Sequence, residues 1–326
     1  MFSVDRTKLE FNGDLIKRLI DKGDAVVFTL NKNVALGNQI ISWNTNKKFF
    51  PPEMSDGMIR VGYLMDNAHK IGLDDLAMPD QPINEKLIEE CHELTVDEIK
   101  AFYSTDTYQR EGTIWNVDKN YSAIFMTRQT YRAIERELGK DVALVFPAAD
   151  CAVVRFYDPV NDVIGITHSD AIHTGREIIP KCVKYMASHF GSDPKDIEAY
   201  VGAFATEGWT YDKIPGFAEV KDEEGNTVGI NDLWRPYIEH RADGKYEIHY
   251  GEIIYDQLVG TGLSIDNISF SPDNTLTNDA YFSNSRSYNS RVDGVATYRE
   301  GRNMMGITFG KQKLLDDGIP RGVQIR

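Results

Sequence analysis

The chain has 326 residues, of which 41% are hydrophobic and 26% charged, and its formal net charge is −14. This is the composition of an ordinary globular protein with enough apolar residues to build a sizeable core. The excess of carboxylates would repel phosphate backbones and anionic lipid headgroups. We therefore expect neither a nucleic-acid-binding nor a membrane-binding protein, and the sequence says nothing of the oligomeric state.

The cysteines and the N-terminal residues indicate the compartment. Cys91, Cys151 and Cys182 are odd in number and far apart in the sequence, so they predict no disulfide framework. The first residues lack the apolar core of a signal peptide. No run of about 18 apolar residues predicts a transmembrane helix. We therefore expect a cytoplasmic protein.

The first half of the chain shows strand and helix patterns without an internal repeat. Residues 24–30 are apolar enough to predict a strand. An acidic helix is expected over 85–103, with Thr95 as a cap within it. Another helix is expected over 126–138, and Gly139 is placed to end it.

The second half begins with the clearest pattern in the sequence. An apolar strand over 142–151 is followed by a hairpin over 152–168, whose turn is marked by Asp158-Pro159-Val160-Asn161-Asp162. An amphipathic helix over 175–190 and a polar insertion over 213–247 come next, before a last helix and two strands. Strands that alternate with helices and hairpins predict an α/β (α+β) protein with mixed β-sheets in a layered sandwich flanked by helices.

Three sequence blocks follow one another in a specific order. They are PAADCAVVRFYDPVNDVIGITH (147–168), FGSDPKDIEAYVGAF (190–204), and a third that runs from YGEIIYDQLVGTG (250–262) through YFSNSR (281–286) to GRNMMGITFG (301–310). In this order the blocks resemble the laccase-domain (YfiH-like) family. Members of that family were once called multicopper polyphenol oxidoreductases and are now associated with purine nucleoside phosphorolysis and deamination.

The resemblance also implies the domain organisation. It covers most of residues 25–312, which implies a single domain over 1–326 with this stretch as its core. The segments near 85–107 and 213–247 are interpreted as insertions into that domain.

The resemblance implies a metal site. Family members are thought to bind zinc through one cysteine and two histidines, which leaves a fourth position open for catalysis. Cys151 and His168 match two of these ligands, and Asp150 stands beside the cysteine as an acid or base, or as the cap of a turn. Ile83 replaces the third ligand and cannot bind a metal, and His173 is the nearest substitute. We therefore expect zinc to be bound weakly or not at all.

Each of these residues also has a structural interpretation. Free cysteine is among the most buried residue types, so Cys151 fits a core position as well as a reactive one. His168 fits a core or loop histidine, and His173 fits a surface loop. The sequence alone leaves these alternatives open.

Two arginines are candidates for binding a substrate phosphate. The family's arginine in the segment after the histidine is lost, because Ile172 stands in its place. Arg176, near the start of a helix, and Arg286, in the YFSNSR block, remain as candidates, since a guanidinium binds phosphate through two parallel hydrogen bonds. A solvent-exposed helix residue is the alternative for Arg176. Several changes around one pocket predict reduced or altered chemistry.

Three functions stay open at this point. The first is a purine nucleoside phosphorylase or adenosine deaminase type of enzyme, with a purine nucleoside and phosphate as its small molecules. The second is a non-catalytic relative that binds a nucleoside or a protein partner. The third is a metal-independent Cys–His hydrolase, which would need a lowered thiol pKa. Copper-based phenol oxidation ranks last, because the seven histidines are scattered and lack the His-x-His pairs of a multicopper cluster.

Overall fold

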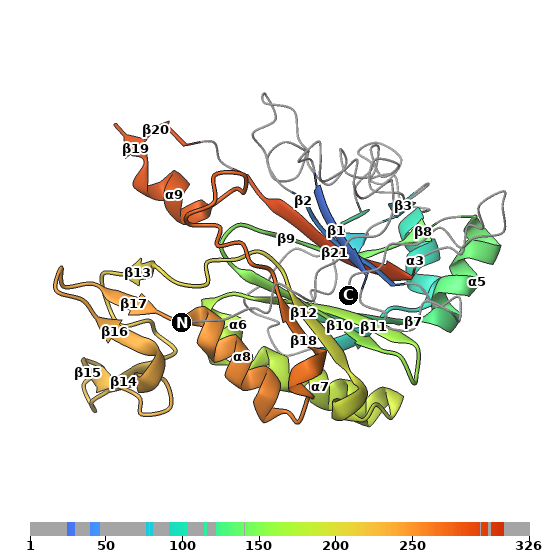
Figure 1. The fold of residues 1–326 in the computed structure, drawn as a ribbon, viewed down its shortest axis with the longest axis horizontal. Helices are drawn as coiled ribbons and strands as arrows, with labels where there is room; N and C mark the ends of the chain where they lie inside the picture. Colours follow the sequence, from blue (N-terminus) through green and yellow to red (C-terminus); the bar gives the residue numbers. More distant parts are fainter. Residues whose placement is uncertain are drawn as a thin grey trace.

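The protein consists of β-sheets stacked in layers, with helices packed around them (Figure 1). The computed structural model describes residues 25–29, 40–45, 76–77, 79–80, 91–103, 114–115, 122–139, 141–293, 295–298 and 301–309. Within these residues, one sheet has six strands and another has four. The predicted α/β class, with mixed sheets in a layered sandwich flanked by helices, is confirmed.

The six-stranded sheet is built around the predicted hairpin. Its strands, in spatial order, are β18 (Ile268–Phe270), β12 (Glu198–Val201), β10 (Ala152–Asp158), β11 (Val163–Ser169), β7 (Ala123–Thr127) and β5 (Cys91–Glu93). The carboxylate of Asp158 accepts hydrogen bonds from the backbone N–H of Val160 and Asn161, which closes the tight turn of the hairpin. Both outer pairs of strands are parallel, and the inner pairs are antiparallel.

The four-stranded sheet covers one face of the six-stranded sheet. Its strands, in spatial order, are β1 (Ala25–Thr29), β2 (Ile40–Thr45), β21 (Asn303–Phe309) and β9 (Leu144–Ala148), and all neighbours are antiparallel. The predicted strands at 24–30, at 142–151 and at the end of the core are confirmed.

Two apolar cores lie on opposite faces of the six-stranded sheet, because successive side chains of a strand point to opposite sides. Val153 and Tyr157 of β10 belong to the core between the two sheets, together with residues of β9 and β21. Ala152, Val154 and Phe156 belong to the other core, which α7 (Ile178–Tyr185) and α8 (Tyr250–Gly260) cover. Figure 1 shows these helices on the face away from the four-stranded sheet.

The expected helix over 85–103 is wrong in part. Cys91–Glu93 form β5, because their backbone pairs in parallel with β7 at the edge of the sheet. The helix α3 covers only Val96–Tyr103. Thr95 does cap it, since Thr95 and Glu98 exchange hydrogen bonds in a capping box. Residues 85–90 lie outside the described residues.

The helix predicted over 126–138 is confirmed as α5 (Arg128–Leu138), and it ends at Gly139, whose φ of 65° is left-handed. The single helix expected over 175–190 is wrong in its extent. A short helix, α6 (Ala171–Gly175), precedes α7, and a π-helical turn follows it over Met186–Phe190. Glu177 separates α6 from α7 with a positive φ of 57°.

Five short strands in and next to the segment 213–247 form two small sheets. These strands are β13 (Trp209–Tyr211), β14 (Glu219–Lys221), β15 (Thr227–Ile230), β16 (Ile238–His240) and β17 (Tyr246–Ile248). The turn between β14 and β15 contains Gly225, whose φ is 85°. Trp234 and Ile248 are buried in the helix-side core, so this lobe packs onto the body of the protein.

The remaining elements are short. They are β3 (Leu76–Ala77), β4 (Pro79–Asp80), β6 (Ile114–Trp115), β8 (Asp141–Val142), α9 (Asn284–Asn289), β19 (Arg291–Val292) and β20 (Val295–Ala296). No helix within the described part of the chain combines the length and the apolar character that a membrane crossing needs.

Candidate functional site

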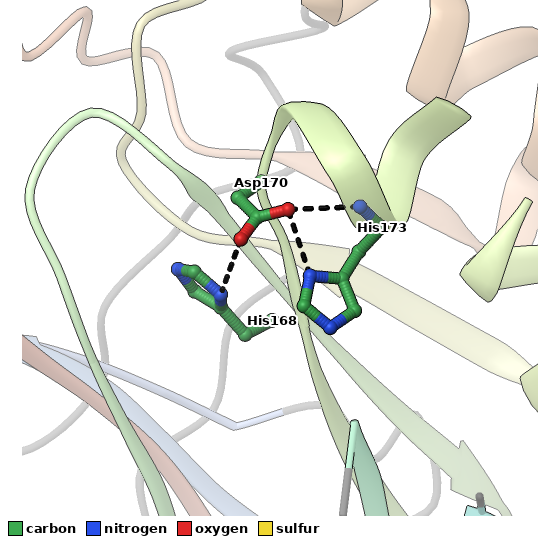
Figure 2. A group of neighbouring side chains, drawn as sticks. All are labelled: His168, Asp170 and His173. Atoms are coloured by element: carbon green, nitrogen blue, oxygen red, sulfur yellow. Dashed lines mark hydrogen bonds and ion pairs between the residues drawn. The ribbon is translucent and has the colours of Figure 1, made fainter. Parts of the chain in front are cut away.

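Three polar side chains meet where the hairpin strand β11 leads into α6. His168 lies near the end of β11 and pairs with Val153 of β10, Asp170 is the N-cap of α6, and His173 lies within that helix. Figure 2 shows the carboxylate of Asp170 between the two imidazole rings. The strand fixes one histidine and the capped helix fixes the other.

Asp170 has two roles at once. One carboxylate oxygen accepts a hydrogen bond from the backbone N–H of His173 at 2.8 Å, which caps the helix, and it also lies 2.7 Å from Nδ1 of the same residue. Burial tends to raise the pKa of Asp170, but the contacts with His173 and His168 outweigh it and hold the pKa below its ordinary value. Asp170 is therefore a carboxylate at neutral pH.

His168 and His173 are both buried, and His168 lies next to the core between the sheets, since it pairs with Val153. Only 5% of its surface is exposed, and its ring lies 6.1 Å from that of Phe146. Burial lowers its pKa to about 4, although the charge of Asp170 pulls in the other direction. Its Nδ1 lies 3.9 Å from Asp170 and has no hydrogen-bond partner among the described residues. His168 is thus a neutral imidazole with an unused ring nitrogen.

His168, Asp170 and His173 could hold a metal ion. Each offers one donor atom, and these three atoms lie within 4.8 Å of one another. Two imidazole nitrogens and one carboxylate oxygen are suitable ligands for a divalent transition metal. Among the described residues this is the one group of three or more such donors, and Cys151 is not a member of it.

Cys151 directly precedes β10, whose first residue pairs with Ser169 at the end of β11. It is partly buried and packs against the core between the sheets. Burial raises the pKa of its thiol well above the ordinary value, and the charges of Asp170 and Asp150 act in the same direction. The strand register pairs Ala152 with Ser169, so Cys151 and Asp170 adjoin the same pair of strand ends. The thiol is protonated at neutral pH.

Asp150 is held in a hydrogen-bond network that ties the hairpin to a distant segment. Its buried carboxylate accepts hydrogen bonds from the hydroxyls of Thr275 and Ser283 and from the backbone N–H of Ser285. Its φ of 80° is left-handed, a conformation that aspartate tolerates better than most residues. These contacts are those of a turn residue that anchors the segment 275–285.

The two candidate phosphate ligands differ in their surroundings. Arg176 is exposed at the end of α6, two residues before α7. The guanidinium of Arg286 donates to the carbonyl oxygens of Asn278 and Tyr281 and pairs with Asp279. Arg286 therefore has a structural role in the 278–286 loop, whereas Arg176 faces solvent. Ile83, where the resemblance places the missing ligand, lies outside the described residues.

Several residues near the site were not predicted from the sequence. Asp170 is one of them, although the spacing Asp170-x-x-His173 is that of a helix cap. Tyr211 and Tyr250 have their hydroxyl oxygens 3.0 Å apart. The pKa of Tyr211 is raised to about 12, mainly by burial, and Asp170 contributes in the same direction. Arg302 lowers the pKa of His168, so it too lies within electrostatic reach.

The chain was compared with known protein families and proteins. Residues 136–308, more than half of the chain, match the family model described as multi-copper polyphenol oxidoreductase laccase. A stretch of 63 residues is 38% identical to "Purine nucleoside phosphorylase YlmD" of Bacillus subtilis (strain 168), and it covers 19% of this chain. That match spans 23% of the curated relative's own length.

Solved structures support the same fold. The hypothetical protein YfiH of Bacillus licheniformis is 19% identical, with 89% of this chain and 98% of that chain covered and a TM-score of 0.61. YlmD of Geobacillus stearothermophilus is 17% identical, with 84% and 92% covered and a TM-score of 0.57. At these identities the likeness shows the shared fold.

Proposed function

Because this chain belongs to the multi-copper polyphenol oxidoreductase laccase family, we propose that it acts on a purine nucleoside in the pocket beside His168. The relative from Bacillus subtilis with the matching 63-residue stretch is a purine nucleoside phosphorylase by name. The observation that carries the proposal is the group of two buried histidines, His168 and His173, around the partly exposed Asp170, which lies inside the segment that matches the family. Adenosine and inosine are the substrates to test first.

The side chains of the pocket suit the chemistry of a departing or attacked purine. His168 is neutral at neutral pH, because burial lowers its pKa to about 4, and its unpartnered ring nitrogen can bind a metal or accept a hydrogen bond. Asp170 orients His173 through a short contact with Nδ1. The hydroxyls of Tyr211 and Tyr250 stay protonated, because burial raises their pKa values. One hydroxyl donates to the other at 3.0 Å, which leaves one O–H to donate to a purine ring.

Zinc is the metal that the family resemblance implies, with Cys151, His168 and His173 as its donors. When bound, the ion would supply Lewis acidity, polarising a water or a substrate oxygen. The described residues fit this thiol-containing set poorly, since Ile83 stands in for a ligand and Cys151 lies outside the compact group of three donors, so we expect this set to bind zinc weakly or not at all. A multicopper cluster does not fit, because the described residues hold one such donor group only.

We expect turnover to be slower than in relatives that keep the family's arginines. Arg286 is committed to two backbone carbonyls and Asp279, which leaves the exposed Arg176 as the candidate for phosphate. The loss of one charge-assisted contact commonly costs about 2–4 kcal/mol in a transition state, or roughly 30- to 1000-fold in rate. The rate of phosphorolysis should fall further than the rates of hydrolysis or deamination, because those two reactions need no phosphate.

A metal-independent Cys–His hydrolase is less well supported. Its nucleophile would have to be a thiolate. Burial and two nearby carboxylates raise the pKa of Cys151, which opposes thiolate formation.

The test is an assay of the purified protein with adenosine and inosine, with and without phosphate and zinc, that measures free base and ammonia beside YlmD as a reference. We expect slow release of base or ammonia that His168→Ala abolishes. Nucleoside binding without turnover would favour the non-catalytic relative. If the protein neither binds nor turns over any purine nucleoside, the proposed function is wrong.

A further inference from the structure

The described residues offer a donor set that differs from the cysteine and two histidines of the family resemblance. Cys151 does not join the three donor atoms that lie within 4.8 Å of one another, whereas Asp170 does. Ligand atoms that bind one ion at about 2.0–2.2 Å lie at most about 4.4 Å apart. A small rotation of one side chain would therefore bring all three donors onto a single ion.

The backbone holds these donors in place before any ion binds. His168 is fixed in β11, which pairs with a strand on each side. Asp170 and His173 are fixed to each other by the helix cap, since the carboxylate accepts the N–H of His173 at 2.8 Å. Such positioning lowers the entropic cost of binding.

A second observation also indicates a missing ligand. Nδ1 of His168 is buried, has no hydrogen-bond partner among the described residues, and faces the second carboxylate oxygen of Asp170 at 3.9 Å (Figure 2). A buried polar atom without a partner is costly in a folded protein. A cation between Nδ1 and the carboxylate would satisfy both groups.

We propose that this chain binds one divalent transition-metal ion through His168, Asp170 and His173, with the carboxylate of Asp170 in place of a thiolate. Two imidazoles and one carboxylate leave further coordination positions open, as in non-haem iron enzymes. The set accepts Zn²⁺, Co²⁺, Mn²⁺ and Fe²⁺, and it lacks the sulfur ligand that favours soft ions such as Cu⁺. The site belongs to the pocket of the proposed function, but it can be tested without any substrate.

The test is a titration of the metal-stripped full chain with Co²⁺, followed by calorimetry and by the absorption spectrum. We expect one equivalent to bind, without the near-ultraviolet charge-transfer band that a thiolate–cobalt bond produces. Cys151→Ser should leave the affinity and the spectrum unchanged. A thiolate band that disappears in Cys151→Ser would overturn the proposal, as would the absence of stoichiometric binding.

Asp170→Asn tests the carboxylate itself. Asparagine caps a helix as well as aspartate does, so α6 should form and the metal-free circular dichroism spectrum should match the parent's. We expect the Co²⁺ affinity to fall by at least about 100-fold, because a carboxylate that only orients a histidine typically accounts for roughly 10- to 100-fold. An unchanged affinity would overturn the assignment of Asp170.

The matched control is another imidazole–carboxylate pair of this chain. His189 lies 2.9 Å from Glu93, and its side chain is half exposed. His189→Gln should leave the stoichiometry at one. If His189→Gln abolishes the binding instead, the ion sits on the surface and the proposed site is wrong. This result would leave the nucleoside proposal standing, since that proposal is judged by turnover and nucleoside binding.

Discussion

Asp150 and Asp170 lie at the two strand ends of the β10–β11 hairpin, and their hydrogen bonds differ. The carboxylate of Asp150 receives three donors, two from hydroxyls and one from the backbone of Ser285. The carboxylate of Asp170 caps a helix and keeps one oxygen toward His168. Asp150 therefore anchors the segment 275–285 to the start of β10, whereas Asp170 belongs to the donor group with His168 and His173.

This difference predicts the effect of replacing Asp150. Asp150→Ala leaves the two hydroxyls and the N–H without an acceptor, so we expect the free energy of unfolding to fall by about 3 kcal/mol. Asp150→Asn keeps one acceptor oxygen and should cost about half as much. Urea denaturation measures both. An Asp150→Asn variant that is as stable as the parent but inactive would show instead that Asp150 acts as an acid or base.

The two arginines should separate stability from phosphate binding. Arg286→Ala removes two hydrogen bonds to carbonyl oxygens and the stacking on Tyr298, which we expect to lower the stability by about 2 kcal/mol. Arg176→Ala should change the stability by less than about 0.5 kcal/mol, because the side chain is exposed. In the phosphorolysis assay Arg176→Ala should raise the KM for phosphate. An unchanged KM would remove Arg176 from the site.

At the scale of elements, the lobe that contains β14–β17 is packed against the helix that carries His173. A Cβ atom added at Gly175, the last residue of α6, would lie only 2.3 Å from Cβ and 2.5 Å from Cγ of Phe217. Because Cβ of Phe217 is fixed by the backbone, a rotamer change cannot relieve this contact. The absence of a side chain at Gly175 is what lets the lobe approach α6.

Gly175→Ala is therefore expected to destabilise the protein. Alanine gains about 1 kcal/mol in helix propensity over glycine, but overpacking costs about 1–3 kcal/mol. The clash with Cβ of Phe217 should place the cost of overpacking at the upper end of this range. Gly216→Ala is the matched control, because a Cβ there meets nothing within 4 Å. Thermal unfolding of both variants measures the difference. Equal melting temperatures would mean that the lobe does not press on α6.

Local signals in the sequence predicted the elements that depend on neighbouring residues. The hairpin turn at Asp158 and the helix end at Gly139 follow from short-range chemistry, and both are confirmed. The strand β5 was missed, since its backbone pairs with β7 some thirty residues away and tertiary pairing overrode an acidic, helix-like pattern. The break before α7 was missed as well, because nothing in the sequence marks the left-handed conformation of Glu177.

The same distinction applies to the site. The family resemblance pointed to Cys151, His168 and His173, and the structure places the two histidines in one donor group. Asp170 was missed because the resemblance implies a cysteine and two histidines as donors and no carboxylate. The network of Asp150 with residues 275–285 spans more than a hundred positions, and no local pattern encodes such a contact.

At the scale of the whole molecule, the six-stranded sheet organises both the cores and the pocket. Its central hairpin consists of β10 and β11 (Figure 1). Cys151 directly precedes β10 and His168 lies near the end of β11, so the antiparallel pairing brings them to the same end of the sheet. The helices α7 and α8 cover one face, and the four-stranded sheet covers the other. The chain has the fold of the family, and the proposed metal donors within that fold are His168, Asp170 and His173.

Anomalous diffraction from crystals of the metal-stripped protein soaked with Zn²⁺ would locate the ion and identify its ligands. The predicted result is one strong anomalous peak about 2.0–2.2 Å from donor atoms of His168, Asp170 and His173. A peak within bonding distance of the sulfur of Cys151 and not of Asp170, or no peak near His168, would show that His168, Asp170 and His173 do not form the metal site.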